Sequence, residues 1–131
     1  MNRFVLSFGI AACISAPAMA GDVLSASEKA GLQAAMVQHI DRTLVKGAYL
    51  HVDFKDGVVK QLAPAKAHPM IMSMGDNFVL CTEFRAPGGA DVNMDFYVAR
   101  RDKGFVVFHT EVDNRKPLEA LINSGKVKPV S

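Results

Sequence analysis

Residues 25–54, SASEKAGLQAAMVQHIDRTLVKGAYLHVDF, decide the fold because their hydrophobic period changes at Gly47. Before this glycine, apolar residues recur every four positions, which is the spacing of one helix face: Leu32, Met36, Ile40 and Leu44. Ser25 and Glu28 form a capping box at the start of this segment, and Gly47 ends it. The stretch therefore predicts an amphipathic helix followed directly by a strand.

After Gly47 the period becomes two, which is typical of a strand with one covered face. The alternating apolar residues, which we expect to face the helix, are Ala48, Leu50, Val52 and Phe54. The residues between them, which then face away, are Tyr49, His51 and Asp53. Asp56-Gly57 is a hairpin signal, so residues 58–62 are expected to pair with the first strand.

The rest of the chain continues as a meander. Three further strands are predicted at residues 77–85, 91–100 and 105–112, while residues 64–69 interrupt the pattern with two prolines. A short C-terminal helix is predicted through Pro117, Leu118, Leu121 and Ile122, stopped by Gly125. Asp113 or Asn114 is expected to cap this helix, and residues 113–117 are also suited to the rim of a binding site. The tail at residues 126–131 is expected to be frayed.

The sequence thus predicts one α+β domain over residues 21–131. An N-terminal amphipathic helix packs on an antiparallel meander of four to five strands, and a short C-terminal helix follows. This element order resembles the cystatin-like and nuclear-transport-factor-like architectures, although the glycine-flanked inhibitory loop of cystatins is not recognisable. The resemblance implies a helix that covers one sheet face, and it leaves the function open because one fold supports many functions.

Residues 1–20 have the composition of a secretory signal peptide. Asn2 and Arg3 form a short basic start, residues 4–14 are nearly all apolar, and Ala18-Met19-Ala20 offers small residues for cleavage. The apolar run is shorter than the roughly 20 residues of a membrane span, so a retained anchor is the less favoured alternative. We therefore expect a periplasmic or secreted domain without a transmembrane span.

Composition narrows the class of partner. Without Arg3, the 111 residues that remain carry one more basic than acidic residue, which gives no electrostatic reason to expect a nucleic acid. Cys81 is then the one remaining cysteine, so no internal disulfide can form. Its apolar neighbours favour a buried, inert thiol over a reactive nucleophile. The oligomeric state stays open.

The first candidate site is the segment HPMIMSM at residues 68–74. In an extended strand, alternate residues share a face, so one imidazole and three thioethers point the same way: His68, Met70, Met72 and Met74. These are ligands that suit Cu(I). The alternatives are that the methionines fill the core under the helix, or that they line a surface for an apolar ligand.

The second candidate site is the polar side of the strands, which could hold a polar ligand or transfer a proton. Its predicted members are His51, Asp53, Glu83, Arg85, Asp95, Tyr97 and His109, with Cys81, Asn93 and Glu111 beside them. His109 and Glu111 belong to this side if Val106 and Phe108 point inward. The alternative is an ordinary solvated sheet face.

These patterns leave three functional hypotheses. The first is a small exported binding module, non-catalytic, for an unknown small ligand or a periplasmic protein. Its pocket, or else simply its core, would be formed by Met36, Met70, Met72, Phe78, Phe84, Met94 and Phe96. The second is a copper-binding protein, with Cu(I) as the one cofactor suggested. The third is a small acid/base enzyme that uses His51, Asp53, Glu83, Asp95 or His109, although no catalytic motif of known spacing is present.

Overall fold

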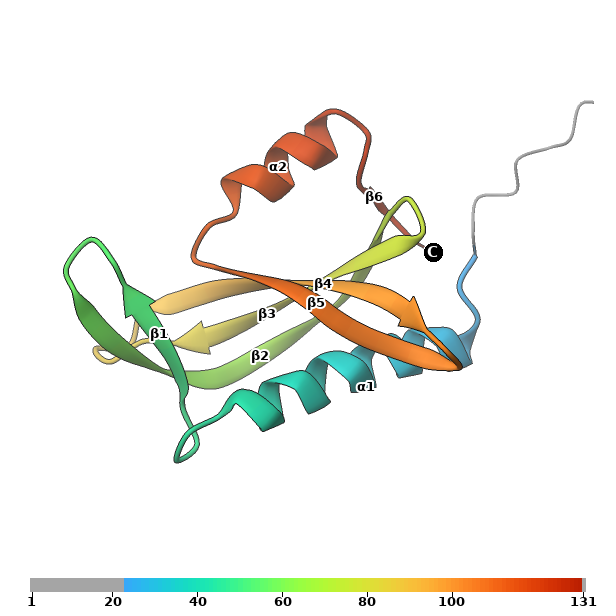
Figure 1. Cartoon of the computed structure of the whole chain (residues 1–131). Helices are drawn as coiled ribbons and strands as arrows, with labels where there is room; N and C mark the ends of the chain where they lie inside the picture. Colours follow the sequence, from blue (N-terminus) through green and yellow to red (C-terminus); the bar gives the residue numbers. More distant parts are fainter. Residues whose placement is uncertain (1–22, 131) are drawn as a thin grey trace, which may run out of the picture.

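The computed structural model describes residues 23–130, so the predicted signal peptide at residues 1–20 lies outside the described residues. The elements are, in chain order, α1 (Ala26–Thr43), β1 (Tyr49–Asp53), β2 (Val58–Met74), β3 (Asn77–Arg85), β4 (Asp91–Arg101), β5 (Gly104–Val112), α2 (Lys116–Asn123) and β6 (Lys128–Pro129) (Figure 1). The predicted α+β class is confirmed. Within residues 23–130, no helix is long and apolar enough to cross a membrane.

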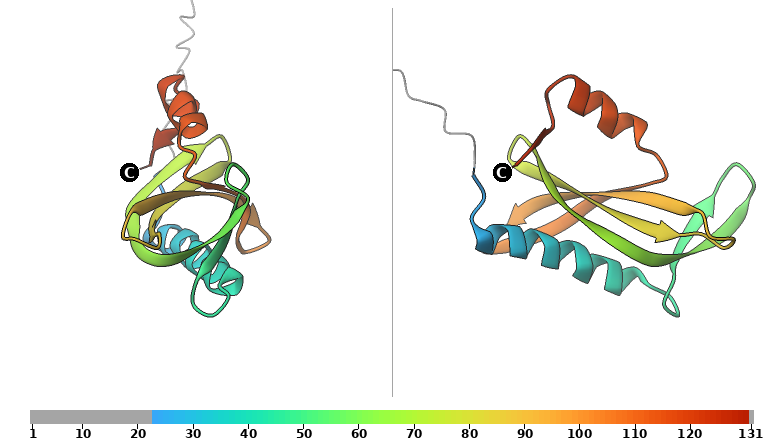
Figure 2. Two further views of the ribbon diagram at one scale, coloured as in Figure 1. Left: turned by 90° about the vertical axis from the view of Figure 1, so that its left-hand side faces the viewer. Right: turned by 180° about the vertical axis from the view of Figure 1, so that it is seen from behind.

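The sheet is an antiparallel meander in the order β1-β2-β3-β4-β5, and the short β6 pairs with β2. Both views of Figure 2 place α1 and α2 on opposite sides of this sheet. The β1–β2 hairpin projects beyond both helices at one end (Figure 1). The two sheet faces are therefore covered by different helices, and the ends of the sheet are left partly open.

The capping box predicted for α1 is present. Ser25 Oγ accepts a hydrogen bond from the Glu28 backbone N–H at 3.2 Å, and Glu28 Oε2 accepts one from the Ser25 backbone N–H at 3.0 Å. Leu32, Met36 and Ile40 are buried against the sheet, as the four-residue spacing predicts. The helix ends at Thr43, which is earlier than the predicted end at Gly47.

The core between α1 and the sheet is densely filled. Of the residues considered for a ligand pocket, Met36, Phe84, Met94 and Phe96 are at most 1% exposed. Their side chains therefore fill the core and leave no ligand space there. Phe78 belongs to the same core, whereas Met70 and Met72 lie elsewhere.

A second core lies under α2. It consists of Met72, Val79, Cys81, Tyr97, Leu118 and Val127, with Met74 and Leu121 packed against it. The C-terminal tail contributes to both cores: Val127 is buried in the second core, whereas Val130 packs against the first core and its backbone N–H donates to the Ile71 carbonyl at 2.9 Å. The expectation of a frayed tail is wrong for residues 127–130, because β6 adds to the edge of β2. The predicted cap of α2 is also wrong, since its N-cap residue is Arg115, whose side chain makes no capping hydrogen bond to the helix.

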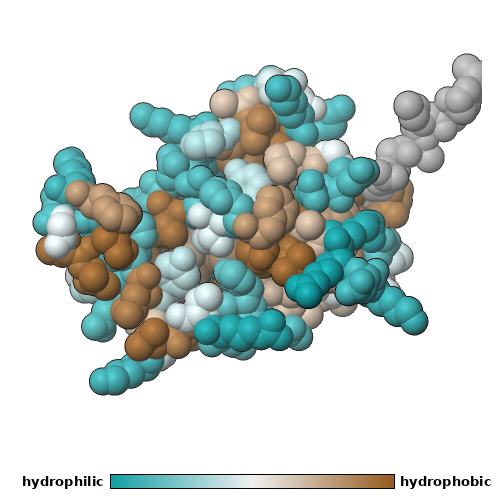
Figure 3. Space-filling view, in the orientation of Figure 1, coloured by the Kyte–Doolittle hydropathy of each residue, from teal (hydrophilic) through white to brown (hydrophobic). Residues whose placement is uncertain are grey.

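The expected orientation of β1 is reversed. Leu50, Val52 and Phe54 are 42, 44 and 91% exposed, whereas the Tyr49 ring packs edge-on against Phe84 in the core. Leu50 and Val52 point to the α2 side of the sheet, opposite to Tyr49, and α2 does not extend over the hairpin (Figure 1), so these side chains stay exposed. The exposed apolar residues of the hairpin form the brown region on the left of Figure 3: Leu50, Val52, Phe54, Val58 and Val59.

Two strands depart from simple alternation. β2 runs without interruption through residues 64–69, and register shifts absorb the two prolines of that segment. Beyond the second shift, Ile71 faces α1 while Met72 and Met74 face α2, so these methionines do not lie under α1 as the core hypothesis had placed them.

In β5 a register shift falls between Val107 and His109, which leaves Phe108 54% exposed and Val107 buried. Phe108 therefore does not point inward as predicted. His109 nevertheless pairs with Tyr97, because the register shift places His109 on the predicted side of the sheet.

Candidate functional site

Most of the predicted polar set does lie together, on the α2 side of the sheet. Cross-strand pairing aligns Glu83 with Asn93, Cys81 with Asp95, and Tyr97 with His109. Asp95 also lies opposite Glu111. Within this group the structure brings together the predicted site residues Glu83, Asp95, Tyr97 and His109. We call this group, completed by Arg115, the polar face.

Arg115 is the central residue of the polar face, and the sequence did not single it out. It stands at the N-cap of α2 and reaches back over β3 and β4. Its Nη1 donates to Asn93 Oδ1 at 2.7 Å and lies 3.6 Å from Asp95 Oδ1, while its Nη2 donates to Cys81 Sγ at 3.6 Å. The sequence pointed to Arg115 only through the interpretation of residues 113–117 as the rim of a binding site.

The acidic and thiol groups beneath Arg115 are buried. Asp95 is 1% exposed, and its Oδ1 accepts a hydrogen bond from Asn93 Nδ2 at 2.9 Å. Burial, together with the neighbouring Asp95, raises the pKa of the Cys81 thiol to about 12. The predicted burial of this thiol is confirmed, and the raised pKa disfavours the reactive thiolate form.

Each imidazole of the polar face is paired with a carboxylate. His68 Nε2 lies 3.0 Å from Glu83 Oε1, and His109 Nε2 lies 2.8 Å from Glu111 Oε1. Asn114 also donates to Glu111, and these two hydrogen bonds lower the pKa of that carboxyl group. Burial and the nearby Asp95 raise the pKa of Tyr97. Two hydrogen-bonded groups thus lie side by side here. Asn114, Glu111 and His109 form one, and Arg115, Asn93, Asp95 and Cys81 form the other.

His51 and Asp53 do not belong to the polar face. The reversal of β1 turns both toward the α1 side, where they line a separate pocket of about 490 Å³. Arg85 forms an exposed ion pair with Asp91 at 2.8 Å, near the end of the same pocket. The seven predicted ligand-binding residues are thus divided between two sides of the sheet.

We call this second hollow the sheet-end pocket. It lies between the β1–β2 hairpin, the turn after β3 and the end of β5, where α1 no longer covers the sheet (Figure 1). Its apolar wall consists of Leu62, Ala86, Pro87, Ala90, Val92 and Val112. Its charged rim consists of His51, Asp53, Lys60, Asp91 and Asp113.

The rim of the sheet-end pocket has an excess of carboxylates. Asp53 is paired with Lys60, and this contact lowers the pKa of Asp53 and raises that of Lys60. Asp91 is paired with Arg85. Asp113, held at a positive φ of 51°, has no ion pair with another residue in the range 23–130. The pocket is therefore net acidic with an apolar interior.

The third hollow, which we call the bulge cavity, has a volume of about 310 Å³. It is lined by His68, Pro69, Met70, Met72, Cys81 and Arg115. Three of the four predicted copper ligands therefore meet in one cavity, while Met74 packs against the second core outside it. Cys81 is the donor atom that the sequence pattern did not assign to this group.

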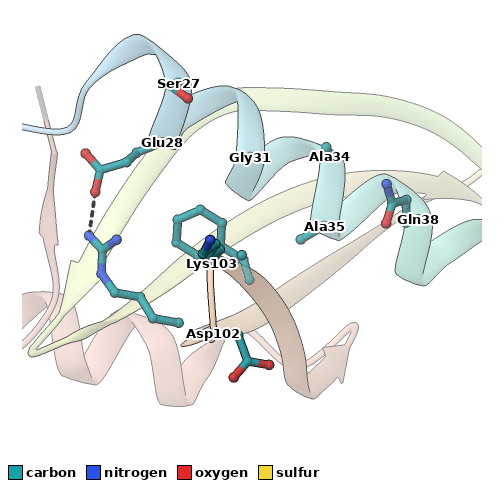
Figure 4. A pocket seen from close by; sticks show the side chains of 11 residues that line it. Ser27, Glu28, Gly31, Ala34, Ala35, Gln38, Asp102 and Lys103 are labelled. Atoms are coloured by element: carbon teal, nitrogen blue, oxygen red, sulfur yellow. Dashed lines mark ion pairs between the residues drawn. The ribbon is translucent and has the colours of Figure 1, made fainter.

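A fourth hollow, of about 570 Å³, lies between α1 and the β4–β5 turn (Figure 4). The ion pair of Glu28 with Arg100, at 2.8 Å, crosses one end of it. The Arg100 guanidinium also lies 5.2 and 5.4 Å from the ring centroids of Phe78 and Phe105. Because Glu28 is part of the capping box, this contact fastens the start of α1 to the β4–β5 hairpin and has a structural role.

Comparisons with protein-family models, with curated proteins and with solved structures give no match. The resemblance to cystatin-like and nuclear-transport-factor-like domains therefore stays one of element order.

Proposed function

We propose that the protein is a small exported binding module without catalytic activity, and that its ligand occupies the sheet-end pocket. The observation that carries this proposal is the combination of an apolar wall with a charged rim in one hollow of about 490 Å³. Small-molecule sites are commonly concave, mainly apolar, and equipped with a few polar groups that fix the orientation of the ligand.

The charge of the rim indicates the class of ligand. Three carboxylates face one ammonium group and one imidazole: Asp53, Asp91 and Asp113 against Lys60 and His51. Since Asp53 and Asp91 already have cationic partners, Asp113 is the carboxylate available to a ligand. We therefore infer a ligand with an apolar body and a primary amine or other cationic group.

The division of the polar residues excludes an acid/base site that combines all five residues of the catalytic hypothesis. His51 and Asp53 lie on one side of the sheet, whereas Glu83, Asp95 and His109 lie on the other. A general base must reach the proton that it removes, within about 2.6–3.2 Å or through one water. Residues on opposite faces of a sheet cannot act on one substrate.

Nuclear magnetic resonance titration with two matched probes tests the proposal. Phenethylamine carries an ammonium group and 3-phenylpropionate carries a carboxylate on a similar apolar body. We expect the amine to shift the amide signals of Val92 and Val112, and the carboxylate to bind more weakly.

Two variants and a matched control complete this experiment. Asp113→Asn should weaken amine binding, and Ala90→Trp should block the pocket. The control is Asp102→Asn, because Asp102 has the same φ of 51° in the distant β4–β5 turn. Equal binding of the two probes, or amine binding that survives both pocket variants, would contradict the proposal.

A further inference from the structure

The bulge cavity exists because β2 carries extra residues opposite β3. Ala67 pairs with Thr82 and Ile71 pairs with Leu80, so residues 68–70 lie opposite Cys81 alone. An unbroken antiparallel ladder would place one residue there. The additional backbone bends away from the partner strand, as β-bulges do, and re-aims the side chains of His68 and Met70.

The donors that line this cavity are three sulfur atoms and one imidazole, all of which are ligands for copper. Met70 and Met72 supply thioethers, Cys81 supplies a thiol, and His68 supplies an imidazole. Thioether and thiolate sulfur select soft ions such as Cu(I), whereas carboxylates and water suit harder ions. Within residues 23–130 no group of three or more His, Cys, Asp or Glu side chains is placed to hold a metal ion. Among the described residues there is thus no comparable group of side chains for a hard divalent ion.

His68 is held in a manner that suits a ligand. Its Nε2 is hydrogen-bonded to Glu83 Oε1 at 3.0 Å, which leaves Nδ1 as the nitrogen available to a metal. A metal-binding histidine usually gives its other ring nitrogen to a carboxylate or carbonyl, and this partner fixes the ring and raises its basicity. Glu83 therefore occupies the position of an outer-shell partner.

The charge beside the cavity favours a monovalent ion. Arg115 Nη2 lies 3.6 Å from Cys81 Sγ, and its positive charge is balanced by the buried carboxylate of Asp95, 3.6 Å from Nη1. When a monovalent ion replaces the thiol proton, Cys–SH and Cu(I) give Cys–S–Cu(I) and a released H⁺, and the net charge of the cavity is unchanged. A divalent ion would leave one uncompensated positive charge beside the balanced Arg115–Asp95 pair, in a partly buried site where water screens charge weakly.

We propose that the bulge cavity binds one soft monovalent cation, Cu(I) or its redox-inert analogue Ag(I), through four side chains: His68, Met70, Met72 and Cys81. Arg115 and Glu83 act as positioning residues. This site lies on the α2 side of the sheet, apart from the sheet-end pocket, so the proposal does not depend on the proposed ligand of that pocket.

Titration of protein with ¹³C-labelled methionine methyl groups tests the proposal directly. We expect one equivalent of Ag(I) to shift the methyl signals of Met70 and Met72 and to leave those of Met36 and Met94 unchanged. The affinity for Cu(I), measured under anaerobic conditions against a competing chelator, should fall in Met70→Leu. Since loss of an outer-shell partner costs about 10–100-fold in metal affinity, Glu83→Gln should weaken binding in this range, and loss of a ligand at least as much.

The matched control is Met74→Leu. Met74 lies on the same side of β2 as Met72 but outside the cavity, so this variant should bind Cu(I) like the parent. Met70 is 56% exposed, so Met70→Leu keeps the fold and isolates the loss of the thioether. The proposal is overturned if the Met70 and Met72 signals do not move, if Met74→Leu weakens binding as much as Met70→Leu, or if Zn(II) competes equally with Cu(I).

Discussion

The guanidinium of Arg115 lies 3.6 Å from the buried carboxylate of Asp95, and this contact joins the start of α2 to the middle of β4. Asp95 is 1% exposed, whereas the side chain of Arg115 is 38% exposed. Every buried side-chain nitrogen and oxygen atom of residues 23–130 has a hydrogen-bond partner. Arg115 is thus the cationic partner of the most buried carboxylate in the polar face.

Replacement of Arg115 by alanine should destabilise the protein markedly. The change leaves Asp95 with Asn93 as its hydrogen-bond donor, and loss of a partner for a buried polar group costs about 1–3 kcal/mol in the free energy of unfolding. The control is Arg85→Ala, which removes an exposed ion pair with Asp91 and should cost about 0–1 kcal/mol. Urea denaturation measures both variants, and equal losses would show that the contact with Asp95 contributes nothing.

Cys81 should be nearly inert to thiol reagents in the folded protein. Its pKa is raised from about 9.0 to about 12, chiefly by burial, so the thiolate at pH 8 is about a thousandfold scarcer than in the unfolded chain. We expect slow reaction with a disulfide reagent in buffer and rapid reaction in urea. Leu118→Ala should accelerate the reaction, because Leu118 is fully buried in the same core as Cys81. Rapid, stoichiometric labelling of the folded parent would contradict this prediction.

Periodicity predicted the elements of this fold but not the orientation of every element. The four-residue spacing placed Leu32, Met36 and Ile40 correctly because α1 packs along the sheet. Period two in β1 shows that its two faces differ, yet it cannot show which face is covered. That choice depends on tertiary packing: Tyr49 joins the core under α1, which turns Leu50 and Val52 to the other face of the hairpin, where α2 does not cover them.

The candidate sites were predictable only where strands are regular. β3 and β4 pair without a shift, so Glu83, Asp95 and Tyr97 were placed on one face from alternation alone. In β2, Pro64 and Pro69 marked an irregular segment but did not give its register, and the shift in β5 had no local signal; these shifts form the bulge cavity and expose Phe108. Arg115 reaches Cys81 from 34 positions away in sequence, which only the packing of α2 reveals.

The capping box of α1 should make stability depend on pH in the acid range. Hydrogen bonds from Ser25 and Arg100 lower the pKa of Glu28 below 4.5, so the folded state binds the proton less readily than the unfolded state. The stabilisation is present above about pH 4.5 and is lost as the pH falls through the lower, folded-state pKa. Glu28→Gln should therefore be less stable than the parent at pH 7, and the difference should narrow in urea denaturation as the pH is lowered toward 3.

Ser25→Ala provides the contrast, because the hydrogen bond from the Glu28 backbone N–H to Ser25 Oγ involves no charge. Loss of an N-cap side chain costs about 0.5–2 kcal/mol, and we expect a loss of this order at pH 7 that persists near pH 3. A stability gap between the parent and Glu28→Gln that persists unchanged at pH 3 would show that the ionised carboxylate is not the source of the stabilisation.

Gly31→Ala should destabilise the protein although alanine favours a helix by about 1 kcal/mol over glycine. A Cβ at position 31 would lie 3.0 Å from the Phe105 ring, and this ring cannot move freely because it packs edge-on against Phe78 and under Arg100. Overpacking of this kind costs about 1–3 kcal/mol, so the net loss should be about 0–2 kcal/mol.

The addition of Phe105→Leu to Gly31→Ala should cost less than Phe105→Leu costs alone, because the smaller side chain makes room for the new methyl group. A double-mutant cycle in urea measures this coupling. Additive effects, or a stabilised Gly31→Ala single variant, would show that the close contact between α1 and β5 does not require glycine.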